Sequence, residues 1–213
     1  MPLCGALGMG ALYLLVVRPR AARWGATEEE AGRPLPGDGV VPGRTYVATR
    51  AITIDAPPED VWPWIVQMGS GRGGWYALDR LDNGGVPSAE EIVPELQELQ
   101  IGDLIPMGVG KEVGPRVLEM ESGRRMLWAT DDEFTWEWVL EPRDGDRTRL
   151  ISRIREQYPP LLSRKMLYAL VASTGDVVMN WTQLKRIKRR AERLALSRTG
   201  APAPKTSTSR SAS

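Results

Sequence analysis

Hydrophobic and polar residues alternate along much of the chain, and this pattern predicts mainly β-strands. Residues 45–54 are rich in Val, Thr and Ile, which predicts a strand. Turn signals such as ESGR and RDGD separate the later strand candidates. These candidates cover 103–107, 113–121, 125–129, 134–141 and 148–157. Because the strands follow one another through short turns, we expect an antiparallel meander rather than alternating strands and helices.

Helical patterns occur before and after this meander. The first predicts a helix over 59–68, bent by an internal proline at Pro63, and a short helical piece follows at 89–99. From 159 to 197 the composition is helical, with apolar residues at helical spacing in its second half. Gly175 is expected to mark a break within that stretch. This order of elements predicts an α+β fold in which a curved antiparallel sheet wraps around a long C-terminal helix and leaves a cavity between them.

The composition also predicts segments outside this domain, which we place at 44–197. Residues 24–43 are rich in Pro, Gly and Glu and are expected to form a linker, although Thr27 is a candidate helix cap. Residues 198–213 are rich in Ser, Thr, Ala and Pro, which is typical of a disordered tail.

The N-terminal segment, 1–23, is apolar up to Val17 and then carries Arg18, Arg20 and Arg23. We expect it to be a membrane anchor, although its uncharged run is short for a helix that spans a bilayer. The arginines that follow favour an orientation that places the domain in the cytoplasm. Two other interpretations remain open: an apolar N-terminal helix that packs on the domain, or a longer span truncated by a wrongly assigned start.

Composition removes several kinds of chemistry. The 213 residues include no histidine and one cysteine, which excludes a Ser-His-Asp triad, a Cys-His dyad, a His-ligated metal and an intrachain disulfide. The net charge of +1 points to no polyanionic partner. We therefore expect no metal, no cofactor and no nucleic-acid partner.

A glycine-rich stretch, GSGRGGWY at 69–76, matches the spacing G-x-G-x-x-G of dinucleotide-binding loops. A predicted helix precedes it and no βαβ unit surrounds it, so we reject nucleotide binding. One interpretation is a turn that ends the helix with glycine at positive φ. The other is a lid at the entrance of a cavity, where Arg72, Trp75 and Tyr76 would contact a ligand.

Aromatic side chains share one face of the strand predicted at 134–141. Phe134, Trp136, Trp138 and Leu140 project to the same side, because side chains alternate along a strand. Trp128, on the neighbouring strand, is expected to join them. The face either packs against the long helix or lines a ligand pocket, and both interpretations remain open.

Charged residues on the strands suggest a solvated outer face. Arg149, Arg153 and Arg155 share one side of their strand, where Glu137 and Glu141 of the next strand can pair with them. Four carboxylates are the candidates for acid–base chemistry, although none stands in a recognisable arrangement: Asp79, Asp82, Asp103 and Glu137.

The last helix carries basic residues around its apolar stripe. We expect a basic amphipathic helix whose polar face is either simply solvated or contacts anionic lipid headgroups. The residues of this expected membrane surface are Lys185, Arg186, Lys188, Arg189, Arg190 and Arg193.

Several motifs resemble those of bacterial proteins in the SRPBCC superfamily, which contains START-like lipid-transfer domains, polyketide cyclases and Bet v 1-like proteins. They are ATRAITIDAPPEDVWPWIVQMGSGRGGWY, IVPELQELQIGD, TRLISRIR and KRIKRRAE, and the resemblance covers 24–194. It implies the helix-grip fold and a hydrophobic ligand. The subgroup usually has a Glu-Asn pair after the WY motif, whereas this chain has Asp82 and Asn83.

Together these features predict a domain that binds a hydrophobic small molecule or lipid in an internal cavity at the cytoplasmic face of a membrane. The Trp-lined walls would desolvate the ligand, with Arg72 and Tyr76 orienting it near the entrance. Two alternatives remain: a polyketide cyclase- or dehydratase-like enzyme, and a membrane-surface or interaction protein with a filled core.

Overall fold

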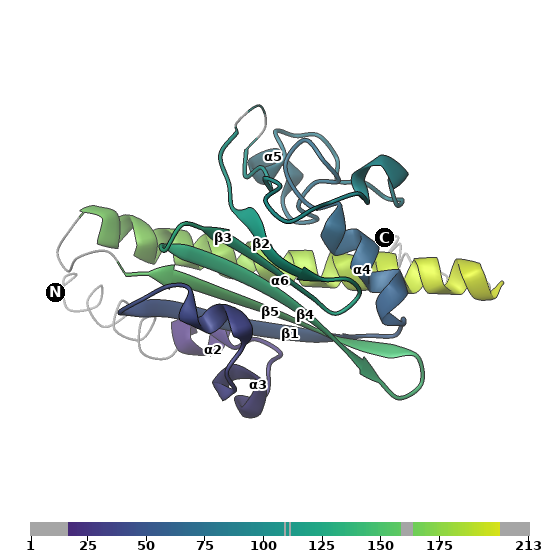
Figure 1. Cartoon of the computed structure of the whole chain (residues 1–213), viewed down its shortest axis with the longest axis horizontal. Coiled ribbons are helices and arrows are strands. Elements are labelled where there is room, and N and C mark those ends of the chain that lie inside the picture. Colours follow the sequence, from purple (N-terminus) through teal and green to yellow (C-terminus); the bar gives the residue numbers. More distant parts are fainter. Residues whose placement is uncertain (1–16, 109, 111, 159–163, 201–213) are drawn as a thin grey trace, which may run out of the picture.

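A five-stranded antiparallel sheet forms the centre of the molecule (Figure 1). The computed structural model describes residues 17–108, 110, 112–158 and 164–200, with the backbone alone at 164–176 and at 199. The strand order is β1-β5-β4-β3-β2. The bounds are β1 Thr45–Ile54, β2 Arg116–Glu121, β3 Arg125–Thr130, β4 Phe134–Arg143 and β5 Arg147–Gln157. The predicted meander is therefore confirmed for β2 to β5, with β1 added beside β5.

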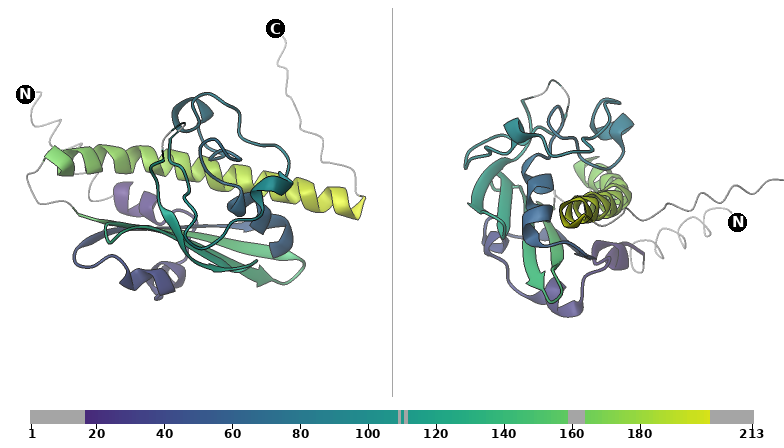
Figure 2. Two further views of the ribbon diagram at one scale, coloured as in Figure 1. Left: turned by 45° about the horizontal axis from the view of Figure 1, so that its top comes forward. Right: turned by 90° about the vertical axis from the view of Figure 1, so that its right-hand side faces the viewer.

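One long helix, α6 (Arg164–Thr199), crosses the sheet, and α4 (Pro58–Val66) packs beside it (Figure 2). The helix continues through Gly175, so the predicted break is wrong. A glycine inside a helix costs only about 1 kcal/mol, which packing of a long helix outweighs. This curved antiparallel sheet with its long C-terminal helix is the α+β helix-grip fold that we predicted.

The main hydrophobic core lies between the sheet and these two helices. The inner face of the sheet contributes alternate residues, among them Ile54, Trp138 and Leu150. Leu184 and Ile187 come from α6, and all five side chains are fully buried. The helical periodicity read from the sequence thus identifies Leu184, Ile187 and Ala191 as buried, whereas Trp181, which the same spacing places on this stripe, is 39% exposed.

Two predicted elements differ from the structure. Residues 89–99 hold only a short 3-10 turn, Pro94–Leu96, because the backbone N–H of Val93 donates to the side chain of Gln67 instead of continuing a helix. Residues 103–107 run along 113–117 with a single bridge, between Leu104 and Arg116, and form no regular strand. In the same region, α5 (Asp79–Asp82) is a single helical turn.

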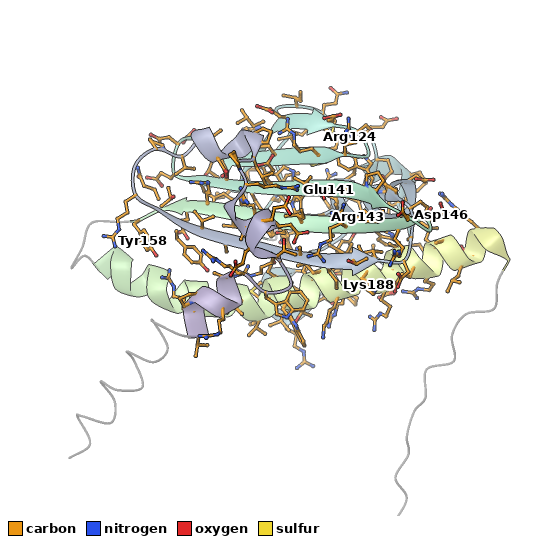
Figure 3. All side chains as sticks on the ribbon, turned by 90° about the horizontal axis from the view of Figure 1, so that it is seen from below. Arg124, Glu141, Arg143, Asp146, Tyr158 and Lys188 are labelled. Atoms are coloured by element: carbon orange, nitrogen blue, oxygen red, sulfur yellow. The ribbon has the colours of Figure 1, made fainter. Side chains whose placement is uncertain are left out.

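The segment 24–43, expected to be a linker, packs on the outer face of the sheet (Figure 3). It contains α3 (Glu28–Gly32), which begins at Thr27 with a capping box, and a 3-10 turn at Pro36–Gly39. The carboxylate of Glu30 pairs with Arg149 at 2.7 Å. These contacts make the segment part of the domain.

The same segment covers the arginines of β5, which were expected to face solvent. Arg153 is 3% exposed and pairs with Asp38 at 2.8 Å, while Arg155 pairs with the same carboxylate at 2.7 Å. Arg153 also donates to the backbone oxygen of Glu30 and to the hydroxyl of Thr49. The outer face is therefore an ion-pair layer under α3 rather than a solvated surface.

The chain before the sheet begins, in the described part, with α2 (Arg18–Ala22), which contacts β1 and α6. Arg50, buried in β1, donates to the backbone oxygen of Ala21. No helix among the described residues is long and apolar enough to cross a membrane. Residues 1–16 of the predicted anchor and 201–213 of the predicted tail lie outside the described residues.

Candidate functional site

Four tryptophans gather between the sheet and the helices. Trp75, Trp128, Trp136 and Trp138, which we call the tryptophan cluster, are each no more than 7% exposed. Trp136 stacks on Trp75 and Trp138, with ring centroids 5.7 and 5.0 Å away. Trp128 meets these three rings at 5.6 to 6.2 Å in edge-on geometry. Such pairs add attraction beyond the burial of area, so the cluster is a rigid aromatic wall.

The strand register explains how three of these residues meet. Trp136 and Trp138 lie two apart on β4 and so face the same side. Trp128 of β3 lies directly opposite Trp136 in the ladder. Trp75 arrives from the other direction, on the loop that follows α4. The predicted aromatic face of the sheet is thus confirmed, and it lies in the core under α6.

A row of polar side chains runs beside the tryptophan cluster. Ser152 of β5 accepts from the indole N–H of Trp136 at 2.8 Å and from the amide of Asn180 at 3.5 Å. Asn180 donates to Gln183 at 3.2 Å, and Gln183 donates to the backbone oxygen of Trp75 at 2.9 Å. Ser152, Asn180 and Gln183, which we call the polar row, are at most 2% exposed. The row joins the sheet to α6 inside the core.

Three buried polar atoms of the tryptophan cluster and the polar row make no hydrogen bond to any described residue. They are the indole N–H groups of Trp128 and Trp138 and the side-chain oxygen of Asn180. An unsatisfied buried donor or acceptor costs about 1–3 kcal/mol, so such atoms call for an explanation. Together they present two donors and one acceptor in an aromatic surrounding, which suits an apolar molecule with one or two polar groups.

Arg72 does not face this interior through a free guanidinium. The group donates to three backbone oxygens, those of Met68, Val66 and Leu96, at 3.1 to 3.2 Å. Burial lowers the pKa of Arg72 from its ordinary value. The side chain therefore holds the end of α4 against the loop at residue 96, which is a structural role, and its contact with a ligand stays a prediction.

Tyr76 is fully buried and lies against Trp64, with ring centroids 6.0 Å apart. The guanidinium of Arg190 sits 4.9 Å from its ring centroid, and burial raises the pKa of Tyr76. Its backbone φ is +54°, a conformation that costs non-glycine residues about 1–2 kcal/mol. The structure thus places Tyr76 inside the molecule and not at an entrance.

The glycine-rich stretch forms a turn after α4, as one of the two interpretations predicted, although the helix itself already ends at Val66, three residues before Gly69. Gly69 and Gly74 have positive φ and bond to each other through their backbones. Between them, Ser70 donates from its backbone to Pro106 at 2.8 Å and from its hydroxyl to the backbone oxygen of Asp82 at 2.5 Å. These bonds fasten the stretch to two neighbouring loops and direct Trp75 into the core.

The candidate carboxylates do not converge on the tryptophan cluster. Glu137 lies on the outer face, where it accepts from Gly37 and pairs with Arg125, and burial raises its pKa. Burial also raises the pKa of Asp82, whose carboxylate accepts from the backbone of Leu78. Asp79 accepts from Ser88 at 2.5 Å, and Asp103 accepts from the backbone of Gln100 near the surface. None of these four bonds to the tryptophan cluster or the polar row through its carboxylate.

The basic residues of α6 divide into two groups. Arg190 is 3% exposed and pairs with Glu90 at 2.5 Å, so it is not a surface residue as expected. Lys188 pairs with Asp55 and Glu192. Arg193 pairs with Glu90, and Arg186 pairs with Asp79. Lys185 and Arg189 are exposed. The predicted basic face is therefore largely occupied by ion pairs within the molecule.

The polar row was not predicted from the sequence, although the sequence contains a pattern that indicates it. Ser152 stands between Leu150 and Ile154 on the inner face of β5, and Asn180 and Gln183 lie on the buried side of α6. A polar residue at an apolar position of a regular pattern indicates a buried hydrogen bond. The bonds that join α6 to Ser152 and to Trp75, however, connect residues 28 and 108 positions apart in sequence.

Solved structures resemble this chain at low identity. A Polyketide_cyc-like protein of Corynebacterium glutamicum is 13% identical and covers 77% of this chain and 100% of its own, with a TM-score of 0.38. An AHSA1-like protein of Rhizobium etli is 13% identical over 81% and 94%, with a TM-score of 0.40. A protein of Thermobifida fusca is 17% identical over 70% and 94%, with a TM-score of 0.43.

No protein-family model matches the sequence, and no curated protein matches it. Scores of this size carry no argument about function, and the helix-grip assignment rests on the strand order and on α6. The SRPBCC resemblance seen in the sequence motifs implies this fold, and the fold is present.

Proposed function

We propose that the protein binds a hydrophobic small molecule or lipid between the sheet and α6, at the cytoplasmic face of a membrane. One observation carries the binding proposal: the unpaired donors and acceptor of Trp128, Trp138 and Asn180 share an aromatic interior. An acceptor group on the ligand would accept hydrogen bonds from the two indole N–H groups, and the apolar body of the ligand would lie on the tryptophan rings.

The mechanism of binding is desolvation together with orientation. The tryptophan cluster removes the ligand's apolar surface from water, which contributes about 25 cal/mol for each Å². The polar row fixes the orientation, because its internal bonds hold Asn180 in one position. We place the domain at the membrane because an apolar, uncharged stretch precedes Val17 in the sequence.

A fluorescent fatty acid, cis-parinaric acid, tests the binding proposal. Its carboxylate accepts hydrogen bonds, and energy transfer from tryptophan reports its arrival near the rings. We expect saturable binding to the wild-type chain. Trp138→Phe removes one donor and should weaken binding by about 2- to 10-fold, the effect of one hydrogen bond.

The matched control is Trp181→Phe, which makes the same chemical change on the outer side of α6, where Trp181 is 39% exposed. It should leave the affinity unchanged. Absence of saturable binding, or an equal loss of affinity in both variants, would refute the proposed site.

A further inference from the structure

One side of α6 presents an apolar and basic stripe to solvent. Val178 and Trp181 are 53% and 39% exposed, and Lys185 and Arg189 are exposed as well. Their spacing of three and four residues puts all four side chains on one side of the helix. We call these four residues the α6 stripe. It lies away from the core, because the buried residues of α6, such as Leu184, occupy the other side.

The chemistry of the α6 stripe changes along the helix from apolar to basic. The ammonium group of Lys185 lies 3.7 Å from the ring centroid of Trp181, so the two side chains form a cation–π pair on the surface of the helix. Tryptophan and lysine together are typical of the interface between lipid tails and headgroups. Lys188 and Arg190 pair directly with carboxylates. Among the described residues, Lys185 instead lies over the ring of Trp181, and Arg189 acts on Glu90 only through its charge, which helps to lower the pKa of that carboxyl.

The α6 stripe lies next to the point where the N-terminal segment joins the domain. Trp24 packs edge-on against Trp181, with ring centroids 6.2 Å apart, and α2 contacts α6. Figure 3 shows α2 beside α6 along one edge of the molecule. Val17, at the start of the described chain, is 47% exposed, and the sixteen residues before it carry no charge. Arg20 and Arg23 add exposed positive charge near this edge.

We propose that the α6 stripe rests on an anionic lipid surface, so that α6 lies parallel to the bilayer. Val178 and Trp181 would enter the headgroup region, and the basic residues would meet lipid phosphates. The inference rests on the membrane location proposed above and adds the surface that makes contact. The tryptophan cluster then lies on the far side of α6, about one helix diameter, roughly 10 Å, from the lipid.

A fluorescent probe on the stripe tests this contact in the full-length chain. Cys4 is the sole cysteine, so Cys4→Ser followed by Val178→Cys gives one labelling site for an NBD dye. Phosphatidylcholine vesicles containing phosphatidylglycerol should shift the NBD emission to shorter wavelength and raise its intensity. A probe at Leu118→Cys, 43% exposed on β2 at the far edge of the sheet, should not respond.

A charge comparison tests the basic part of the stripe. Lys185→Gln with Arg189→Gln should lose most of the shift at position 178, because each basic residue near an anionic surface strengthens binding about fivefold. Arg124→Gln with Arg143→Gln removes the same charge from exposed side chains elsewhere, in the turn after β2 and at the end of β4, and should keep the shift.

The possible failures are distinct. If the protein floats with vesicles and the probe at 178 does not respond, the surface is wrong and the membrane location stands. If the protein does not float with vesicles, both the membrane location and the contact through the α6 stripe are wrong. The binding of cis-parinaric acid still tests the proposed interior site separately. A probe at 178 that is already shielded before vesicles are added, by residues 1–16 or by a second copy, would also overturn the inference.

Discussion

Two conservative substitutions in the tryptophan cluster should differ in stability, although they remove the same atoms. Trp136→Phe and Trp138→Phe each replace a buried indole by a phenyl ring, so the lost transfer free energy is nearly equal and cancels in the comparison. Trp136 also loses a hydrogen bond to Ser152, which has a net worth of about 0.5–1.5 kcal/mol. Trp138 instead loses an N–H without a partner, which relieves a cost of about 1–3 kcal/mol.

We therefore expect Trp136→Phe to be less stable than Trp138→Phe by about 1.5–4.5 kcal/mol, the sum of these two contributions. For a domain of this size that is roughly 3–18 °C in Tm. Urea unfolding followed by far-UV circular dichroism measures the difference, after refolding from denaturant to remove any bound molecule. Equal stabilities, or a lower stability for Trp138→Phe, would show that the indole of Trp138 has a partner and would remove the basis of the proposed site.

Three further experiments test other parts of the fold. Arg72→Ala should lower the unfolding free energy by about 2–3 kcal/mol, because three backbone oxygens lose their donor, and an unchanged Tm would contradict its structural role. Gly74→Ala should cost at least about 2 kcal/mol more than Gly71→Ala in urea unfolding, since both have positive φ but only at Gly74 would the new methyl group meet a buried serine. The hydrogen bond from Arg149 holds the pKa of Glu30 at about 2 instead of 4.5. Between these two pH values the unfolded chain binds more protons than the folded chain, so the folded state loses stability as the pH falls through that range. Glu30→Gln should be about 2–3 kcal/mol less stable than wild type at neutral pH, and urea titrations should show this gap closing towards pH 2; a constant gap would refute the pairing.

Local pattern was enough to predict the sheet and the face it buries. The alternation around Trp136 and Trp138 gives their common side, because the geometry of a strand depends on neighbouring residues alone. The same reasoning identified the buried side of α6 through Leu184 and Ile187. Both predictions concern periodicity within one element, where the physics is local.

Contacts between distant segments were not predictable from composition. Glu30 and Arg149 form an ion pair although they are 119 residues apart in sequence. The sequence of 24–43 alone does not indicate that its carboxylates contact the arginines of β5. The segment therefore resembled a linker. The contacts of Arg72 were not predictable for a similar reason. Its three acceptors are backbone oxygens, which are present at every residue, so the sequence does not show which of them a side chain will meet.

The candidate site lies between these two cases. Three of its tryptophans follow from strand parity, whereas Trp75 reaches the cluster from a loop whose path depends on Gly69, Gly74 and the bonds of Ser70. The polar row depends on the approach of β5 and α6, which only the folded chain defines.

The central claim is that the interior beside the tryptophan cluster holds an apolar molecule. Mass spectrometry of an organic extract from full-length protein, purified in mild detergent, tests this claim most directly. The account predicts one reproducible apolar compound in a stoichiometric amount, reduced in Trp138→Phe and unchanged in Trp181→Phe. An extract without such a compound from all three proteins would contradict the account and favour a protein whose core is filled by its own side chains.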